Sequence, residues 1–252
     1  PLIGGTAYAW NLKRNLDDID TVKIKTPKAV PDPDEGRAIN VLLLGSDKGE
    51  AKPGQSKKTT ISQDASASEW PSGKYRSDTL MVVHIPADRS RVYLVSIPRD
   101  SFVPIYDRDD KTTHSEKINA AFSAGGPAAA INTVRNLTGL EIDHLAIIDW
   151  EGFKDLSTAV GGVEVTIPES FYDPKQKIRW EAGTQTLEGK EALAYVRTRY
   201  GLIGGDFDRI KRQQNFLRSL MKKMLSNGVT ANPAKLSNTV SALTKNLTVD
   251  EQ

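Results

Sequence analysis

Short runs of branched apolar residues, separated by segments of helical character, constrain the fold of this chain most strongly. Each run is six or seven residues long, and this length and its Val, Ile and Leu content are typical of buried strands. The runs are INVLLLG (39–45), TLMVVHI (79–85), RVYLVSI (91–97), HLAIIDW (144–150) and VEVTIP (163–168). The turn-like PADRS joins the second run to the third and predicts a β-hairpin.

Glycine and proline mark the ends of the helical segments between these runs. Helices are predicted within 117–126, 127–139, 151–162, 188–196, 208–225 and 233–247. In the fifth of these, Ile210, Leu217, Met221 and Met224 form one stripe, which is expected to contact the core. Because strands and helices alternate after a hairpin, we expect an α/β fold, an α-β-α sandwich around a central mixed sheet.

The chain is long enough for one large core, and its 252 residues do not require a second domain. We expect a single domain over 38–252, with 48–75 as a long, polar, mobile loop rich in Ser, Lys, Gly and Pro. Residues 1–37 begin with the apolar PLIGGTAYAW and then become polar. They are either an ordinary first helix or the outer remnant of a removed membrane anchor.

Composition excludes several classes of function. The net charge is only +2, and aromatic residues do not alternate with basic ones, so no nucleic acid partner is expected. Cysteine is absent, which removes disulfides and thiolate chemistry. The chain lacks GxxxxGK[ST], GxGxxG and GxSxG motifs, and its three histidines lack metal-ligand spacing.

One stretch, YVRTRYGLIGGDFDRIKRQQ (195–214), holds five cationic side chains and two carboxylates. If YVRTR is extended, Arg197 and Arg199 leave the same side roughly 7 Å apart, a spacing that suits two phosphoryl groups. GLIGG is then a turn, and Asp206 begins the next helix, on which Arg209 and Gln213 lie one turn apart. The alternative is an exposed helix face on which Arg212 pairs with Asp208.

Two further segments place charged residues at strand ends. Asp47 follows one predicted strand and Asp78 precedes another, so neighbouring strands would bring two carboxylates together, as in many Mg²⁺ sites. Arg76 could pair with Asp78 or reach a substrate. Arg99, beside Asp100, follows a strand directly, where α/β sheets commonly bind ligands. The alternatives are aspartates that cap turns and a surface Arg–Asp pair.

Eight segments together resemble the LytR-CpsA-Psr family. They are NVLLLGSD, RSDTLMVV, LVSIPRDSFV, KINAAFSAGG, IDHLAIIDWEGF, AVGGVEVTIP, LEGKEALAYVRTR and GDFDRIKRQQ, in the family's order from about Asn40 to Leu225. The resemblance implies a single-pass type II protein of the cell membrane with an extracellular catalytic domain. That domain would be an α/β sandwich with an apolar cavity for a lipid.

The resemblance also implies an activity and a set of roles. The protein would transfer a glycan phosphate from a polyprenyl pyrophosphate carrier onto peptidoglycan, using Mg²⁺ or Mn²⁺. Asp47 and Asp78 resemble the metal ligands. The arginines that resemble the diphosphate clamp are Arg76, Arg99, Arg197, Arg199 and Arg209, and Asp206 and Gln213 resemble the polar residues that complete the head-group site. Lys117 matches another position of the family, and Arg212 of the basic stretch is a further candidate for substrate binding. Asp206 either accepts the acceptor's hydroxyl proton or orients Arg209. The alternatives are a pyrophosphatase acting on the lipid carrier and a non-catalytic binder of anionic wall polymers.

Overall fold

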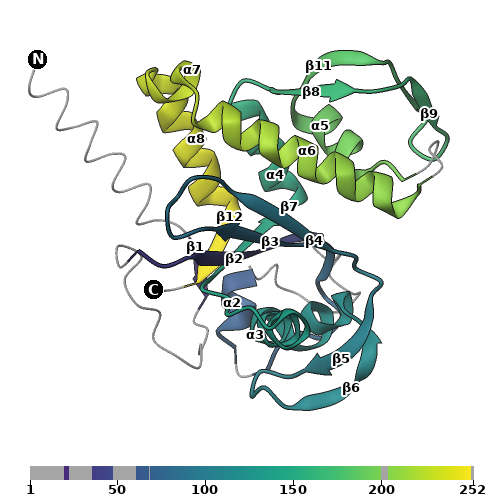
Figure 1. The fold of residues 1–252 in the computed structure, drawn as a ribbon, viewed down its shortest axis with the longest axis vertical. Coiled ribbons are helices and arrows are strands. Elements are labelled where there is room, and N and C mark those ends of the chain that lie inside the picture. The colour runs from purple at the N-terminus through teal and green to yellow at the C-terminus, as the bar shows by residue number, and fades with distance from the viewer. Residues whose placement is uncertain (1–19, 23–35, 48–60, 68, 200–203, 251–252) are drawn as a thin grey trace, which may run out of the picture. The chain divides into compact units, whose positions relative to one another are not determined.

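The computed structural model describes residues 20–22, 36–47, 61–67, 69–199 and 204–250 (Figure 1). These residues form two compact units. We call them the sheet unit (Asp20–Asp149 with Leu247–Asp250) and the helical unit (Trp150–Asn246). Each is described by itself.

A six-stranded mixed sheet organises the sheet unit, in the order β1-β12-β7-β2-β3-β4. β2 is parallel to β7 and β1 to β12, whereas the other neighbours are antiparallel. The strands are β1 (Asp20–Val22), β2 (Ile39–Asp47), β3 (Arg76–Ile85), β4 (Tyr93–Ile97), β7 (His144–Asp149) and β12 (Leu247–Asp250). A separate hairpin pairs β5 (Phe102–Tyr106) with β6 (Thr112–Lys117).

The core of the sheet unit lies between one face of this sheet and the helix α3 (Asn119–Thr138) (Figure 1). Leu42, Leu44 and Val82 are buried there together with Phe122 and Val134 of α3. Alternate residues of β2 point into this core, which is the period-2 pattern of a strand.

A kink divides α3 at Gly126, whose φ of 76° is left-handed. A Cβ atom at this position would lie 2.7 Å from the Trp70 ring, so only glycine fits. The two helices that meet here match those predicted for 117–126 and 127–139, although α3 begins at Asn119 and Lys117 belongs to β6.

The helical unit holds five helices and two small antiparallel strand pairs among its described residues (Figure 1). The helices are α4 (Trp150–Ala159), α5 (Gly189–Arg197), α6 (Asp206–Met224), α7 (Asn227–Thr230) and α8 (Pro233–Asn246). β9 (Phe171–Asp173) and β10 (Ile178–Trp180) form a hairpin, and β8 (Val163–Ile167) and β11 (Gly183–Leu187), which flank it in the chain, form a second antiparallel pair. α4 contacts α5 and α8, and α6 packs on β8 and α5.

The predicted strands and the β3–β4 hairpin are confirmed, as is the α/β class around a central mixed sheet. The predicted α6 stripe is wrong in its register. The most buried α6 residues are Arg209, Arg212, Phe216 and Leu220, whereas Ile210, Leu217, Met221 and Met224 are only partly buried. Two of these four buried residues are arginines, so a search for apolar residues alone misplaces the buried face of α6.

The predicted domain boundaries differ from the arrangement of the described residues. β1, from the segment assigned to 1–37, pairs with β12 and so belongs to the central sheet. The other described residues of that segment are 36 and 37, and the anchor prediction falls largely on residues outside the described ranges. No described helix combines the length and hydrophobicity needed to cross a bilayer.

The second half of the predicted 48–75 loop is ordered, so the prediction of one mobile loop is wrong for this half. It contains α2 (Ile61–Ala65) and buries Tyr75, whose hydroxyl donates to Asp64 at 2.7 Å. Lys74 pairs with the same carboxylate at 2.5 Å. The rings of Trp70, Tyr75 and Phe122 pack together, which ties the segment to α3. Residues 48–60 lie outside the described ranges.

Candidate active site in two clusters

Asp47 and Asp78 lie within neighbouring antiparallel strands, close to the predicted positions at the strand ends. Asp47 is the last residue of β2, and its backbone pairs with that of Arg76, the first residue of β3. Gly45 pairs with Thr79 and Ser46 with Ser77, so Asp78 is the extra residue of a β-bulge. Bulges redirect side chains and are common beside active sites. The prediction that these strands are neighbours is confirmed for the backbone; the Asp47 side chain lies outside the described part of the structure.

Asp78 belongs to what we call the Arg99 cluster, which comprises Asp78, Arg99, Asp100 and Lys117. Arg99 forms an ion pair with Asp78 through Nη1, and its Nε lies 3.7 Å from Oδ2 of Asp100. Lys117 Nζ lies 2.8 Å from the other oxygen of Asp100. Arg76 is exposed at the start of β3. Four of the predicted site residues, Arg76, Asp78, Arg99 and Lys117, thus lie at the ends of β3, β4 and β6.

The turn after β4 holds Arg99 in place. Ser101 donates its N–H to the carbonyl oxygen of Pro98 at 2.9 Å, which closes the turn. The N–H groups of Ile118 and Asn119 donate to the carbonyl oxygens of Ser101 and Arg99, at 2.8 and 3.2 Å. Since Lys117 precedes these residues directly, the same bonds bring its ammonium group to Asp100.

The prediction that YVRTR is extended is wrong. Arg197 is the last residue of α5, and the chain leaves the helix at Thr198, where φ is −57° and ψ is 127°. Arg197 is exposed and its guanidinium lies 5.0 Å from the centre of the Trp150 ring. The alternation expected of a strand therefore does not set the directions of Arg197 and Arg199. Residues 200–203 of the predicted turn lie outside the described ranges.

A second cluster, the Asp206 cluster, comprises Arg199, Asp206 and Arg209. Oδ1 of Asp206 lies 2.7 Å from Nη2 of Arg209 and 3.6 Å from Nε of Arg199. Asp206 is in the first turn of α6, as predicted, where a carboxylate is favoured by the helix dipole. Of the two roles considered for Asp206, this geometry favours the orientation of arginines.

Arg212 and Gln213 lie on the same helix and contact the end of α5. Arg212 is buried, donates to the carbonyl oxygen of Thr198 and places its guanidinium 5.4 Å from the centre of the Phe171 ring. Burial lowers the pKa of Arg212 from its usual high value. Gln213 donates to the carbonyl oxygen of Val196 at 3.3 Å. Direct substrate binding by Arg212 and Gln213 stays a prediction.

The donor set at the strand ends is compatible with a magnesium ion. Mg²⁺ prefers oxygen ligands and commonly takes one or two carboxylates together with phosphate oxygens of the substrate. Asp47 pairs with Arg76, two residues before Asp78 on the neighbouring strand, but Asp78 already holds Arg99. An ion here would share the Asp78 carboxylate with Arg99. No group of three or more metal-ligating His, Asp or Glu side chains occurs among the described residues.

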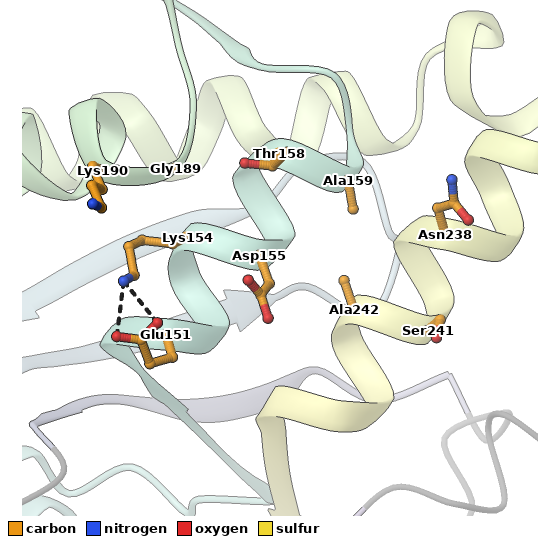
Figure 2. A pocket seen from close by; sticks show the side chains of 10 residues that line it. All are labelled: Glu151, Lys154, Asp155, Thr158, Ala159, Gly189, Lys190, Asn238, Ser241 and Ala242. Atoms are coloured by element: carbon orange, nitrogen blue, oxygen red, sulfur yellow. Dashed lines mark hydrogen bonds and ion pairs between the residues drawn. The ribbon is translucent and has the colours of Figure 1, made fainter.

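A groove of about 560 Å³ lies between α4, α8 and the start of α5 in the helical unit (Figure 2). Lys154 in this groove is held by Glu151 at 2.7 Å, and Lys190 is exposed. Figure 2 shows this Glu151–Lys154 pair at one side of the groove. None of the predicted site residues lines it, and we assign it no ligand. Its lining residues are Glu151, Lys154, Asp155, Thr158, Ala159, Gly189, Lys190, Asn238, Ser241 and Ala242.

Comparison with known proteins identifies the class of protein to which this mixed α/β fold belongs. The family described as LytR_cpsA_psr matches residues 7–252. The chain is 35% identical over 240 residues to the "Cell wall biosynthesis protein LcpA" of Corynebacterium glutamicum, covering 85% of this chain and 45% of that protein. It is 36% identical over 179 residues to the "Polyisoprenyl-teichoic acid--peptidoglycan teichoic acid transferase TagV" of Bacillus subtilis, covering 69% and 44%.

Solved structures agree with these matches. The crystal structure of B. subtilis TagV superposes with a TM-score of 0.66 at 31% identity, over 86% of this chain and 76% of that one. A structure of TagT "bound to LIIa-WTA" gives 0.64 at 25% identity, over 92% and 75%. The chain belongs to the LytR-CpsA-Psr family. It spans about half the length of the curated relatives it matches first.

Sequence reasoning missed Thr198, Gln176 and Phe171, the residues that surround the arginines of the helical unit. Thr198 stands between two predicted arginines and could have been considered. Gln176 and Phe171 lie more than twenty residues earlier in a segment without a recognised motif. No local signal connects them to Arg199, because their proximity depends on tertiary pairing.

Proposed function

We propose that this protein transfers a glycan phosphate from a polyprenyl pyrophosphate carrier onto peptidoglycan. The observation that carries the proposal is the family match over residues 7–252. In this chain, arginines that were predicted to bind the substrate form ion-paired clusters. TagV is named as an enzyme that transfers teichoic acid to peptidoglycan. Arginine suits such a substrate, because its guanidinium forms forked hydrogen bonds with phosphate oxygens.

The positively charged side chains would offset the negative charge that opposes phosphoryl transfer. A diphosphate repels an incoming nucleophile, and the leaving phosphate gains charge as its bond breaks. Arg99, Arg197, Arg199 and Arg209 would neutralise that charge, with Arg76 and Lys117 binding the rest of the head group. Asp206 would hold Arg199 and Arg209 in the orientation that the phosphate oxygens require.

The reaction exchanges one phosphorus–oxygen bond for another. A sugar hydroxyl of peptidoglycan attacks the phosphorus linked to the glycan, a new P–O bond forms, and the P–O bond to polyprenyl phosphate breaks. The hydroxyl proton passes to a base as the new bond forms, and the leaving polyprenyl phosphate carries the released charge. A Mg²⁺ ion on Asp47 and Asp78, or Mn²⁺ in its place, would supply further positive charge at the diphosphate.

The proposed substrate implies a location. The prenyl chain would remain at the membrane or in an apolar cavity of the fold. The catalytic domain would face outward, held at the membrane by a single anchor. The names of the relatives, which refer to the cell wall and to peptidoglycan, support this location.

Incubation with a lipid-linked pyrophosphate glycan, with and without peptidoglycan, tests the proposal. Formation of a glycan–peptidoglycan product that requires the acceptor is the expected result. Phosphate release that is undiminished by acceptor, with no such product, would instead indicate a pyrophosphatase. Tight binding of wall polymer that is unaffected by Asp78→Ala or by chelation of Mg²⁺ would indicate a non-catalytic binder.

A further inference from the structure

Thr198 separates the two arginines at the end of α5, and all three of its polar atoms are hydrogen-bonded. Its N–H and its hydroxyl both donate to the carbonyl oxygen of Ala194, each at 3.0 Å. Its carbonyl oxygen accepts from the guanidinium of Arg212. Its hydroxyl oxygen also accepts from the side-chain amide of Gln176 at 2.9 Å. Thr198 is fully buried, so these bonds fix the point at which the chain leaves the helix.

Gln176 lies in the turn between β9 and β10 and reaches the end of α5. Its Nε2 atom lies 2.9 Å from Oδ2 of Asp173, 3.1 Å from the carbonyl oxygen of Ala194 and 2.9 Å from Oγ1 of Thr198. A carboxylate and a carbonyl group accept hydrogen bonds and do not donate them, so only the amide nitrogen fits this position. The contact therefore requires a side chain of this length that ends in a donor.

Asp173 anchors the turn that carries Gln176. Its buried carboxylate accepts the N–H groups of Lys175 and Gln176, at 2.9 and 3.1 Å, as well as the Gln176 amide. Burial raises the pKa of Asp173, but the hydrogen bonds from Gln176 and Lys175 outweigh it and hold the pKa below its ordinary value. The charged carboxylate is thus the form that this turn stabilises.

We propose that Gln176 and Thr198 are positioning residues, through which the β9–β10 turn sets the orientation of Arg197 and Arg199 toward the substrate. The inference rests on the proposed function, because it assigns these arginines to the diphosphate. Neither Gln176 nor Thr198 is assigned contact with the substrate.

The backbone geometry explains why Thr198 controls both arginines. Arg197 ends the helix and lies against the Trp150 ring, whereas Arg199 follows the extended residue and points to Asp206. A rotation at Thr198 would change the angle between the two guanidinium groups. Misplacement of a catalytic group by about 1 Å can cost on the order of 10²-fold in rate.

Thr198→Val tests the inference, with Thr198→Ser as its matched control. Valine keeps the shape but removes the hydroxyl, whereas serine keeps the hydroxyl. We expect Thr198→Val to lower kcat/KM for the lipid-linked donor on the order of 10²-fold. We expect Thr198→Ser to keep the wild-type value. Circular dichroism and thermal unfolding of each variant would establish that it is folded.

Gln176→Glu adds a second measurement, the pH profile of activity, which a purely structural role of Gln176 would not change. Its carboxylate would face Asp173 and lack the donor, so activity relative to wild type should fall at pH 7. As the pH falls, the introduced carboxyl becomes protonated and regains one donor, so the relative activity should rise. The charged groups close to this position are Asp173 and Arg212.

Binding of farnesyl pyrophosphate, measured by titration calorimetry, separates the possible failures. Wild-type binding that weakens in Thr198→Val and not in Thr198→Ser would support the inference. Equal kcat/KM and equal binding in a folded Thr198→Val variant would overturn it while leaving the proposed function in place. No binding and no transfer by the wild-type protein would overturn both.

Discussion

The two arginine clusters differ in how deeply their side chains are buried. In the Arg99 cluster the side chains of Asp78 and Arg99 are 29% and 17% exposed, and Lys117 is 59% exposed. In the Asp206 cluster the Arg209 side chain is only 5% exposed, although Arg199 is 38% and Asp206 27% exposed. Arg212, one turn further along α6, is also buried. A partly exposed ion pair contributes little to stability, whereas a buried cation that loses its partners is costly. The Arg99 cluster can therefore be changed with little loss of fold, whereas the buried arginines Arg209 and Arg212 cannot.

The largest effect is expected from Arg99→Ala, on activity alone. Removal of one cation that stabilises the developing charge should lower kcat by about 10²- to 10³-fold. The free energy of unfolding should change by less than about 1 kcal/mol, since the Arg99–Asp78 pair is partly exposed. Steady-state transfer rates and urea denaturation measure the two quantities.

Arg91→Ala is the matched control for Arg99→Ala. Arg91 is an exposed arginine two residues before β4, whereas Arg99 lies two residues after it. The control should retain both activity and stability. Equal losses of activity in the two variants would show that the Arg99 cluster has no special role.

Arg212→Met should have the second-largest effect, on stability. The change removes a charged hydrogen bond to the buried carbonyl oxygen of Thr198 and the contact with the Phe171 ring. A hydrogen bond to a charged group contributes about 1.5–3 kcal/mol, and we expect a loss of that size in the free energy of unfolding. Urea denaturation would measure it, with the exposed Arg218→Met as the control on the same helix. A loss below 0.5 kcal/mol, roughly the scatter of surface substitutions, would contradict the structural role of Arg212.

The difference between local sequence patterns and tertiary contacts explains how much of the structure the sequence could predict. The strands β2, β3, β4, β7 and β8 were recognisable because each is a short run of branched apolar residues. The start of α6 was recognisable from Asp206. The extended reading of YVRTR failed, because Arg197 continues α5 and the helix end is set by contacts of Thr198 with Gln176 and Arg212. Those contacts are tertiary and have no local pattern.

Other elements that the sequence did not predict have the same cause, a dependence on tertiary contacts. β12 is a four-residue strand, LTVD, and its place between β1 and β7 depends on pairing with β7, about a hundred positions earlier, and with β1, more than two hundred positions earlier. The segment around Trp70 and Tyr75 appeared to be a loop because of its Ser and Gly content. The rings of Trp70 and Tyr75 nevertheless pack against Phe122 of α3, and Tyr75 is held within the segment by the Asp64 carboxylate. Whether the two clusters act on one substrate stays a prediction.

The smallest effect concerns His144, which links β7 to β12 in the sheet unit. Its Nδ1 lies 3.3 Å from Oδ2 of Asp250, and this hydrogen bond raises the pKa of His144 above its ordinary value, against the effect of burial. Asp143 also raises this pKa, and Arg37 lowers it. A raised pKa means that the folded state favours the protonated ring. The stabilisation is therefore complete below about pH 6.5, the pKa of an unperturbed histidine, and is lost as the pH rises through the folded-state pKa.

His144→Gln should remove this dependence. The wild-type free energy of unfolding should fall by less than about 1 kcal/mol above pH 6.5, and the variant should lack that component. In the helical unit the stability depends on pH in the opposite direction. The lowered pKa of Asp173 gives a stabilisation that is lost only as the pH falls below about 4. Urea denaturation from pH 3 to pH 9 of the wild type, His144→Gln and Asp173→Asn would assign each limb of the profile to its unit. An unchanged slope above pH 6.5 in His144→Gln would show that the His144–Asp250 pair does not act as a link between the two strands.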